Sequence, residues 1–152
     1  MPKVAVMLGS ASDRQVMQHC LDYLGRFSIE CELVVLSAHR QPDETADFAR
    51  KAESRGFSLI IAAAGMAAHL PGVVASHTTL PVIGVPLEGS PLNGVDALYS
   101  IVQMPAGIPV ATVAIGAAGA KNAAVLAAEI LSLVEPSLKT SLAEFRRNGS
   151  KF

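Results

Sequence analysis

Residues 31–44 read CELVVLSAHRQPDE, and this stretch decides the fold that we expect for the chain. Its first part, Cys31–Leu36, is mostly apolar and predicts a buried strand. Gln41–Glu44 predicts the start of a helix, because Pro42 suits a first helical turn and the acidic residues after it suit the positive helix end. Between strand and helix lies Ser37–Arg40, which holds a hydroxyl, a histidine and an arginine. In open α/β sheets, ligands bind at this carboxyl edge of the strands.

The alternation of strand and helix continues on both sides of this stretch. Apolar runs predict strands over residues 3–8, 30–36, 58–64, 81–85 and 109–115. Helical spacing and capping residues predict helices over residues 13–25, 42–55, 69–76, 95–103, 121–133 and 136–147. Within this pattern we expect Gly84–Pro86 to break the fourth strand and Gly116–Gly119 to form a turn.

This alternation predicts one α/β domain over residues 1–152, with neither repeats nor linkers. The expected architecture is three-layered: a flavodoxin-like, doubly wound parallel sheet of five strands in the order 2-1-3-4-5, plus a C-terminal helix. The terminal helix, residues 136–147, connects no pair of strands. We therefore expect it to pack on a neighbouring subunit.

The composition favours an assembly of several copies. Hydrophobic residues make up 51% of the 152 residues and charged residues 16%, which is little charge to cover a lone domain. We therefore expect a homo-oligomer with apolar interfaces. The net charge of −1 gives no electrostatic reason to expect a nucleic-acid or membrane partner.

The cysteines and the first residues predict a cytoplasmic location. Cys20 and Cys31 form no CxxC pair and stand near no histidine cluster, which favours free thiols in a reducing compartment. Met1–Lys3 leads directly into a strand, so no signal peptide is expected. The apolar runs are shorter than the ~20 residues that a membrane-spanning helix needs.

The first strand is followed by a small polar turn, Gly9–Asp13. Backbone donors, the hydroxyls of Ser10 and Ser12 and a helix amino terminus suit an anion or a sugar there, and Asp13 can accept hydrogen bonds from ribose hydroxyls. The pattern is neither a Walker A loop nor GxGxxG. Helix capping by Ser12 or Asp13 explains the same residues equally well.

The second turn points more clearly to a ligand. Arg40 is a cation at the positive end of a helix, which is unfavourable unless an anion binds beside it. A guanidinium next to helix amides forms a clamp for a phosphate. His39 belongs to no helical or strand stripe, and imidazole suits proton transfer at neutral pH. The plainer alternative is a histidine bonded to a neighbouring carbonyl.

The third strand runs into a turn of small residues, Ala64–Gly72, which would let a planar ring approach the backbone. His69 stands alone in this apolar setting, so a satisfied core histidine is the plainer interpretation of it. None of the three turns brings His, Cys and carboxylate groups to metal-ligand spacing, and no metal is expected. From the residues alone, the chain is a phosphosugar-binding α/β protein with one candidate acid/base histidine.

Five motifs that occur in order carry a resemblance. They read Gly9-Ser10-x-Ser12-Asp13, Ser37-Ala38-His39-Arg40-x-Pro42, Ala67-Ala68-His69-Leu70-Pro71-Gly72, Leu80-Pro81-Val82-Ile83-Gly84-Val85-Pro86 and Ser100-Ile101-Val102-Gln103-Met104-Pro105-x-Gly107. Together they resemble the PurE family, the 5-(carboxyamino)imidazole ribonucleotide mutases of purine biosynthesis, in its class I, bacterial form. The similarity runs from about Val4 to Leu131.

The resemblance implies an isomerase that needs no metal or organic cofactor. The carboxylate of 5-carboxyaminoimidazole ribonucleotide moves from the exocyclic nitrogen to the ring carbon, giving 4-carboxy-5-aminoimidazole ribonucleotide. A histidine protonates the carbamate nitrogen, CO2 leaves and is captured by the ring carbon, and the same histidine removes the ring proton. By motif match that histidine is His39, and His69 is the second histidine of the catalytic site.

The resemblance also implies which residues contact the small-molecule substrate, an imidazole ribonucleotide. The matching positions are Ser10, Ser12, Asp13, Ser37, Ala38, Arg40, Gly65, Ala67 and Leu70. The family is a homo-octamer whose sites use neighbouring subunits. A functional coupling to the ATP-dependent synthetase that makes the unstable substrate stays open.

The chain departs from the family at a few positions. Ala63, Met66 and Ala111 stand where glycine is usual, and Ala106 replaces a residue that varies. We expect the bulk of Met66 to alter the shape of the pocket.

Two alternatives to the mutase remain. One is the related carboxylase, which fixes free CO2 directly onto aminoimidazole ribonucleotide. The residues of the segments Ala67–Gly72 and Gln103–Pro105 favour the mutase over this carboxylase. The other is a non-catalytic nucleotide-binding or flavodoxin-like module, which would not need His39.

Overall fold

The central strand of the sheet is apolar on both faces. This strand is β3 (Phe57–Gly65), and its side chains enter two separate cores in turn. Leu59 and Ile61 belong to one core, whereas Ile60 and Ala62 belong to the other. Because successive residues of a strand point to opposite faces, burial of both sets requires helices on each side of the sheet.

The computed structural model describes residues 1–152, and its elements follow the predicted alternation. The strands are β1 (Lys3–Leu8), β2 (Glu30–Val35), β3, β4 (Val82–Leu87) and β5 (Ala111–Thr112). The helices are α1 (Arg14–Arg26), α2 (Pro42–Lys51), α3 (Leu70–Ser76), α4 (Val95–Val102), α5 (Ala117–Leu131) and α6 (Pro136–Arg147), with a 3₁₀ turn at Ala11–Asp13. None of the helices is both long and apolar enough to cross a bilayer.

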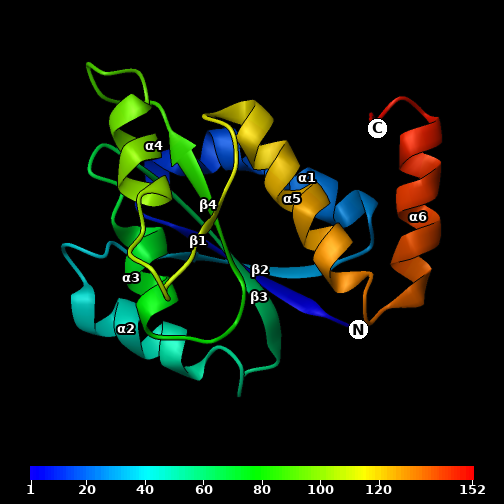
Figure 1. The fold of residues 1–152 in the computed structure, drawn as a ribbon, viewed down its shortest axis with the longest axis horizontal. Helices are drawn as coiled ribbons and strands as arrows, with labels where there is room; N and C mark the ends of the chain where they lie inside the picture. The colour runs from blue at the N-terminus through cyan, green and yellow to red at the C-terminus, as the bar shows by residue number, and fades with distance from the viewer.

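The five strands are all parallel and lie in the order β2-β1-β3-β4-β5, which confirms the predicted doubly wound sheet. Helices α2, α3 and α4 cover one face, and α1 and α5 cover the other (Figure 1). The order in which strands are added to the sheet reverses between β1 and β3: β2 lies on one side of β1, and β3, β4 and β5 follow on the other side. The carboxyl ends of β1, β2 and β3 therefore meet at the edge where ligands bind in such folds.

Helix α6 packs its apolar side on its own chain. Leu138 and Phe145 are buried in the same core as α1 and α5, and the Phe145 ring makes edge contacts with Tyr23 and Phe27. Figure 1 shows the helix outside α1 and α5, with its far side uncovered. The contact of this helix with a neighbouring subunit stays a prediction.

The prediction that Gly84–Pro86 breaks the fourth strand is wrong, because β4 continues through Pro86 to Leu87. The carbonyl of Pro86 accepts a hydrogen bond from the Gly116 N–H at 2.9 Å, so the nitrogen of Pro86 also faces that side. Strand β5 has already ended at that point, so the missing N–H of Pro86 costs the sheet no hydrogen bond.

The prediction of a turn at Gly116–Gly119 is also wrong, because α5 begins at Ala117. A β-carbon on Gly119 would overlap the carbonyl oxygen of Ala114, so glycine permits the helix to start against the preceding chain. Strand β5 covers only Ala111–Thr112 of the predicted residues 109–115, although the N–H groups of Val113 and Gly116 still donate to the carbonyls of Gly84 and Pro86 in β4.

Helix α2 ends at Lys51 rather than at the predicted residue 55. The chain turns through residues 52–56, and the N–H of Phe57, the first residue of β3, donates to the Ala52 carbonyl at 3.1 Å. The other predicted elements agree with the structure to within two residues.

Candidate active site

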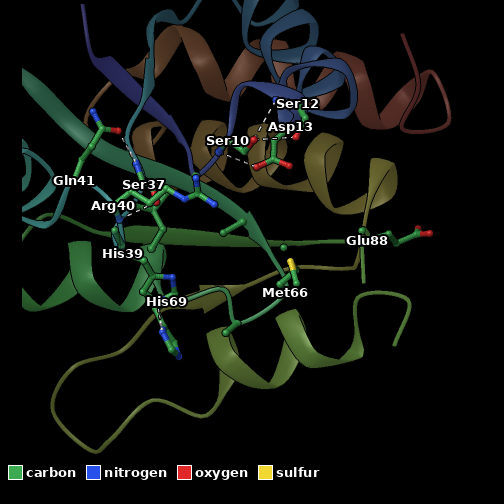
Figure 2. A pocket seen from close by; sticks show the side chains of 17 residues that line it. Ser10, Ser12, Asp13, Ser37, His39, Arg40, Gln41, Met66, His69 and Glu88 are labelled. Carbon is green, nitrogen blue, oxygen red and sulfur yellow. Dashed lines mark hydrogen bonds between the residues drawn. The ribbon is translucent and has the colours of Figure 1, made fainter. Parts of the chain in front are cut away.

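The three polar turns predicted from the sequence line one pocket at the carboxyl edge of the sheet (Figure 2). Its volume is about 710 Å³, which lies within the usual range for sites that take small organic ligands. The lining residues are Gly9, Ser10, Ser12, Asp13, Ser37, Ala38, His39, Arg40, Gln41, Ala64, Gly65, Met66, Ala67, His69, Leu70, Glu88 and Gly89. Every residue that the sequence put in the site lies in this lining, while the roles of those residues stay predictions.

The first turn is held by a capping box. The Ser10 hydroxyl accepts the Ser12 N–H at 3.3 Å, and the Asp13 carboxylate accepts the Ser10 N–H at 3.2 Å. Ser10 therefore caps the 3₁₀ turn, whereas Asp13, at the start of α1, makes no side-chain cap to that helix. The expected cap by Ser12 or Asp13 is corrected to Ser10. The hydroxyls of Ser10 and Ser12 lie 2.9 Å apart and are exposed to the pocket.

Burial raises the pKa of the Asp13 carboxyl, and the hydrogen bond from the Ser10 N–H opposes part of that rise. The carboxylate keeps oxygen lone pairs for a ligand, because Ser10 uses only one of its oxygens.

The second turn is tied back on itself through Gln41. The Ser37 N–H donates to the Gln41 side-chain oxygen at 3.2 Å, and the Gln41 N–H donates to the Ser37 carbonyl at 2.7 Å. The Ser37 hydroxyl accepts the Arg40 N–H at 3.2 Å. These bonds fix the backbone on both sides of His39, so its ring and the guanidinium of Arg40 project from a rigid turn.

Arg40 has no acidic partner. The five ion pairs of the chain involve Lys3, Lys51, Arg55 and Arg146, and none reaches the Arg40 guanidinium. Its side chain is exposed and extends toward the turn that holds Ser10 (Figure 2). A guanidinium left free in a pocket with a helix start nearby suits a phosphate or a carboxylate.

The third turn brings His69 to His39. His69 precedes α3 without capping it, which leaves its ring free, and its Nδ1 lies 2.6 Å from Nε2 of His39. The two rings meet edge to face, with centroids 4.8 Å apart. His69 is therefore exposed and paired, and the interpretation of it as a core histidine is wrong.

The facing nitrogens of the two histidines share one proton, because a hydrogen bond needs one N–H and one lone pair. The pair can therefore take up or release a proton at either of its outer nitrogens. Of the remaining histidines, His19 and His77 lie outside the pocket lining.

Met66 lies in the lining, as expected, but two other lining residues with long side chains were not predicted: Gln41 and Glu88. Glu88 follows β4, whose carboxyl end lies at the same edge, so the rule that found the other turns would have found it as well. Figure 2 shows its carboxylate directed away from the histidine pair. Nothing in the composition of the Gln41 segment indicates its tie to Ser37, which depends on the path of the turn.

Nowhere do three or more His, Cys, Asp or Glu side chains gather as a metal site would require. The two cysteines are free thiols, as predicted. Burial raises the pKa of both thiols, and Cys20 is buried in the core beside β1. Neither cysteine lines the pocket.

Comparison with known proteins gives a consistent result. A model of the family described as AIR carboxylase matches residues 3–151. The N5-carboxyaminoimidazole ribonucleotide mutase of Pyrococcus abyssi is 54% identical over 148 residues, which cover 97% of this chain and 84% of that protein. The mutase of Bacillus subtilis is 52% identical over 147 residues, covering 97% and 91%. The crystal structure of Treponema denticola PurE superposes with a TM-score of 0.89 at 29% identity, covering 99% of this chain and 92% of that one.

Proposed function

The chain belongs to the AIR carboxylase family, and from this premise we propose that it is a carboxylate mutase of purine biosynthesis. The reaction is the conversion of 5-carboxyaminoimidazole ribonucleotide to 4-carboxy-5-aminoimidazole ribonucleotide, an isomerisation. One observation carries the proposal beyond the family: a hydrogen-bonded histidine pair and an unpaired arginine share one pocket of nucleotide size.

The polar turns suit the two ends of a ribonucleotide. Arg40, free of any carboxylate, binds the phosphate together with backbone N–H groups. Ser10 and Ser12 supply hydroxyls for the phosphate end of the ribonucleotide, and Asp13 accepts hydrogen bonds from the ribose hydroxyls. The other predicted contacts are Ser37, Ala38, Gly65, Ala67 and Leu70, all in the lining.

The proton moves twice and ends where it began. His39 gives a proton to the carbamate nitrogen, the N–C bond breaks, and CO2 and aminoimidazole ribonucleotide form. The electron-rich ring carbon then attacks CO2, and His39 takes the proton that this carbon carries. One group that first donates and then accepts completes the cycle, which requires a base active near neutral pH.

His69 supports this cycle through its bond to His39. With Nε2 of His39 bonded to Nδ1 of His69, the imidazole of His39 is held in one orientation. A proton gained at the outer nitrogen of one ring can be balanced through the shared bond by the other. We assign to His39 the direct transfer of the proton to and from the substrate, and to His69 the role of balancing the proton on His39.

Free CO2 offers few groups to bind, so the pocket must retain it by confinement. Gly65 and Ala67 provide small walls beside the histidine pair. We propose no cofactor, because the chemistry needs only one mobile proton and a place that excludes water.

The family description itself keeps a second candidate open. An AIR carboxylase would add free CO2 to aminoimidazole ribonucleotide in the same pocket, with the same ring carbon as nucleophile. The curated relatives at 52% and 54% identity are mutases by name, which favours the mutase.

One experiment separates these functions. The chain is given 5-carboxyaminoimidazole ribonucleotide with no added bicarbonate and with a trap for CO2, and product is followed against an enzyme-free control. Conversion supports the mutase. Conversion that occurs only from aminoimidazole ribonucleotide with high bicarbonate identifies the carboxylase, and no conversion from either substrate leaves a binding module.

We further propose that the chain works in the cytoplasm as a homo-octamer. An apolar stripe on and beside α4 supports the assembly: Leu92, Val95, Tyr99 and Val102 are 42% to 63% exposed and recur at helical spacing. Sedimentation measures the number of subunits. A functional coupling to the synthetase that supplies the substrate is part of the same proposal, and co-sedimentation of the two enzymes tests it.

A further inference from the structure

Met66 holds a backbone conformation that methionine rarely adopts. Its φ is +55°, in the left-handed region where a β-carbon crowds the backbone. The other residues besides glycine with positive φ are Ser28, Asn93 and Ser150, which are polar and lie outside the pocket. Met66 is thus the one apolar side chain of the molecule kept in this conformation.

Packing within the chain does not offset this strain. The Met66 side chain is 60% exposed and belongs to neither core. The surrounding turn fixes it: the Met66 carbonyl accepts the Ala68 N–H at 2.9 Å, and a β-carbon on Gly65 would sit against the Leu87 carbonyl. Backbone strain that the surroundings impose at a pocket is a reason to look for a function there.

The side chain occupies a distinct side of the pocket. Figure 2 shows the Met66 side chain on the other side of the view from His39, His69 and Arg40, below Asp13. The remaining walls are polar groups or small residues, apart from Leu70, which is only 2% exposed. Met66 is therefore the one large apolar side chain of the lining that is exposed.

We propose that the Met66 thioether covers the imidazole ring of the bound ligand. This inference rests on the proposed function, which puts an imidazole ribonucleotide in the pocket with its ring within reach of His39. The ring then lies between His39 and Met66, and an apolar cover on its far side is supplied by Met66. A thioether is polarisable and makes favourable contacts with aromatic rings.

The contact also explains the exposure of the side chain in the free chain. Bound ligand would bury the Met66 methyl and sulfur atoms, and the turn fixes the backbone from which they project before the ligand arrives. Because the side chain is presented in advance, less conformational freedom is lost on binding.

The test compares a ligand that has the ring with one that lacks it. Binding of aminoimidazole ribonucleotide and of ribose 5-phosphate is measured by calorimetry for the wild-type chain, Met66→Gly and Met66→Leu. Glycine adopts positive φ freely, so Met66→Gly folds. We expect Met66→Gly to raise the Kd of aminoimidazole ribonucleotide roughly three- to tenfold and to leave that of ribose 5-phosphate unchanged.

Met66→Leu is the matched control. It keeps an apolar cover of similar volume, so its affinity for aminoimidazole ribonucleotide should stay within about threefold of wild type. An unchanged Kd of aminoimidazole ribonucleotide in Met66→Gly would overturn the proposal. An equal rise of both Kd values would also overturn it, since that result describes a change of pocket shape.

Failure of the proposed function gives a different result. A wild-type chain that binds aminoimidazole ribonucleotide with the expected dependence on Met66, yet converts no carboxylated substrate, refutes the reaction and supports the ring contact. A wild-type chain that binds no aminoimidazole ribonucleotide overturns both.

Discussion

In the proposed reaction the chemistry depends on His39, whose ring is in the pocket, exposed and bonded to a second imidazole at 2.6 Å. His39→Asn keeps a polar side chain of similar size but cannot carry the proton. We expect kcat to fall about 10²- to 10⁴-fold, the usual worth of a general acid–base group, with the affinity for aminoimidazole ribonucleotide nearly unchanged.

Steady-state rates and calorimetry on the same protein check this prediction. His19→Asn is the matched control, since His19 is exposed on α1 and lies outside the pocket lining. A near-normal rate in His39→Asn would remove the proton-carrying role from this residue.

Arg40 is expected to act in binding and not in the chemical step. Because its guanidinium has no carboxylate partner, Arg40→Ala removes a phosphate contact without leaving a buried charge unpaired. Charged hydrogen bonds are worth about 1.5–3 kcal/mol, so KM should rise about 10- to 100-fold with kcat little changed. Arg50→Ala, on the exposed side of α2, should leave KM as it is. An unchanged KM in Arg40→Ala contradicts the assignment.

Asp13 should make binding sensitive to acid. Burial raises the pKa of its carboxyl, so on acidification it becomes protonated at a higher pH than an ordinary aspartate does. The protonated form loses acceptor capacity for the ribose hydroxyls, and affinity for aminoimidazole ribonucleotide should fall as the pH falls through the raised pKa. Titrations of the wild-type chain and Asp13→Asn at several pH values isolate this effect. Identical pH dependence in the two proteins would contradict it.

At the scale of the elements, the close approach of α5 to the end of β5 makes one glycine indispensable. A β-carbon on Gly119 overlaps the Ala114 carbonyl, whereas one on Gly25, in the last turn of α1, meets nothing within 4 Å. Gly119→Ala should lower the free energy of unfolding by about 3 kcal/mol, and Gly25→Ala should raise it by about 0.5–1 kcal/mol. Denaturant titrations measure both, and equal stabilities of the two variants would disprove this packing.

The same region shows where prediction from sequence ends. The strands before each polar turn were predictable because they are largely apolar runs, and in Leu59–Ala64 the run is continuous, as burial on both faces requires. Gly116–Gly119 is too short and too rich in glycine to give such a signal, and its helical state depends on contact with Ala114, which is set by the packing of α5 on the sheet. Pro86 was misjudged for a similar reason, since what matters is which neighbour its nitrogen faces.

The site was predictable to the extent that the sheet order was. Parallel strands bring the turns after β1, β2 and β3 to one edge, and this rule brought the three turns together, whereas His69 was assigned to the site only through the resemblance. The rule says nothing about side-chain pairing. The bond between the two histidines and the tie of Gln41 to Ser37 depend on rotamers and turn geometry that a sequence does not encode locally.

At the scale of the whole molecule, the exposure of the site in a single chain matters most. Ser10, His39, Arg40 and His69 are all exposed, so one subunit alone offers CO2 an open way out. The apolar stripe that includes Tyr99 is also uncovered in one subunit. The proposed octamer accounts for both the open pocket and the uncovered stripe, because copies that pack together can cover apolar surface and close the pocket at the same time.

The most direct test of the account follows the carboxylate carbon itself. The chain is given 5-carboxyaminoimidazole ribonucleotide labelled with ¹³C in its carboxylate, in buffer that contains unlabelled bicarbonate, and the product is read by mass spectrometry. If CO2 is held in the pocket between its release and its capture, 4-carboxy-5-aminoimidazole ribonucleotide keeps the label. Product that carries unlabelled carbon from the buffer would show that CO2 escapes and is taken up again from solution, and would contradict the mutase.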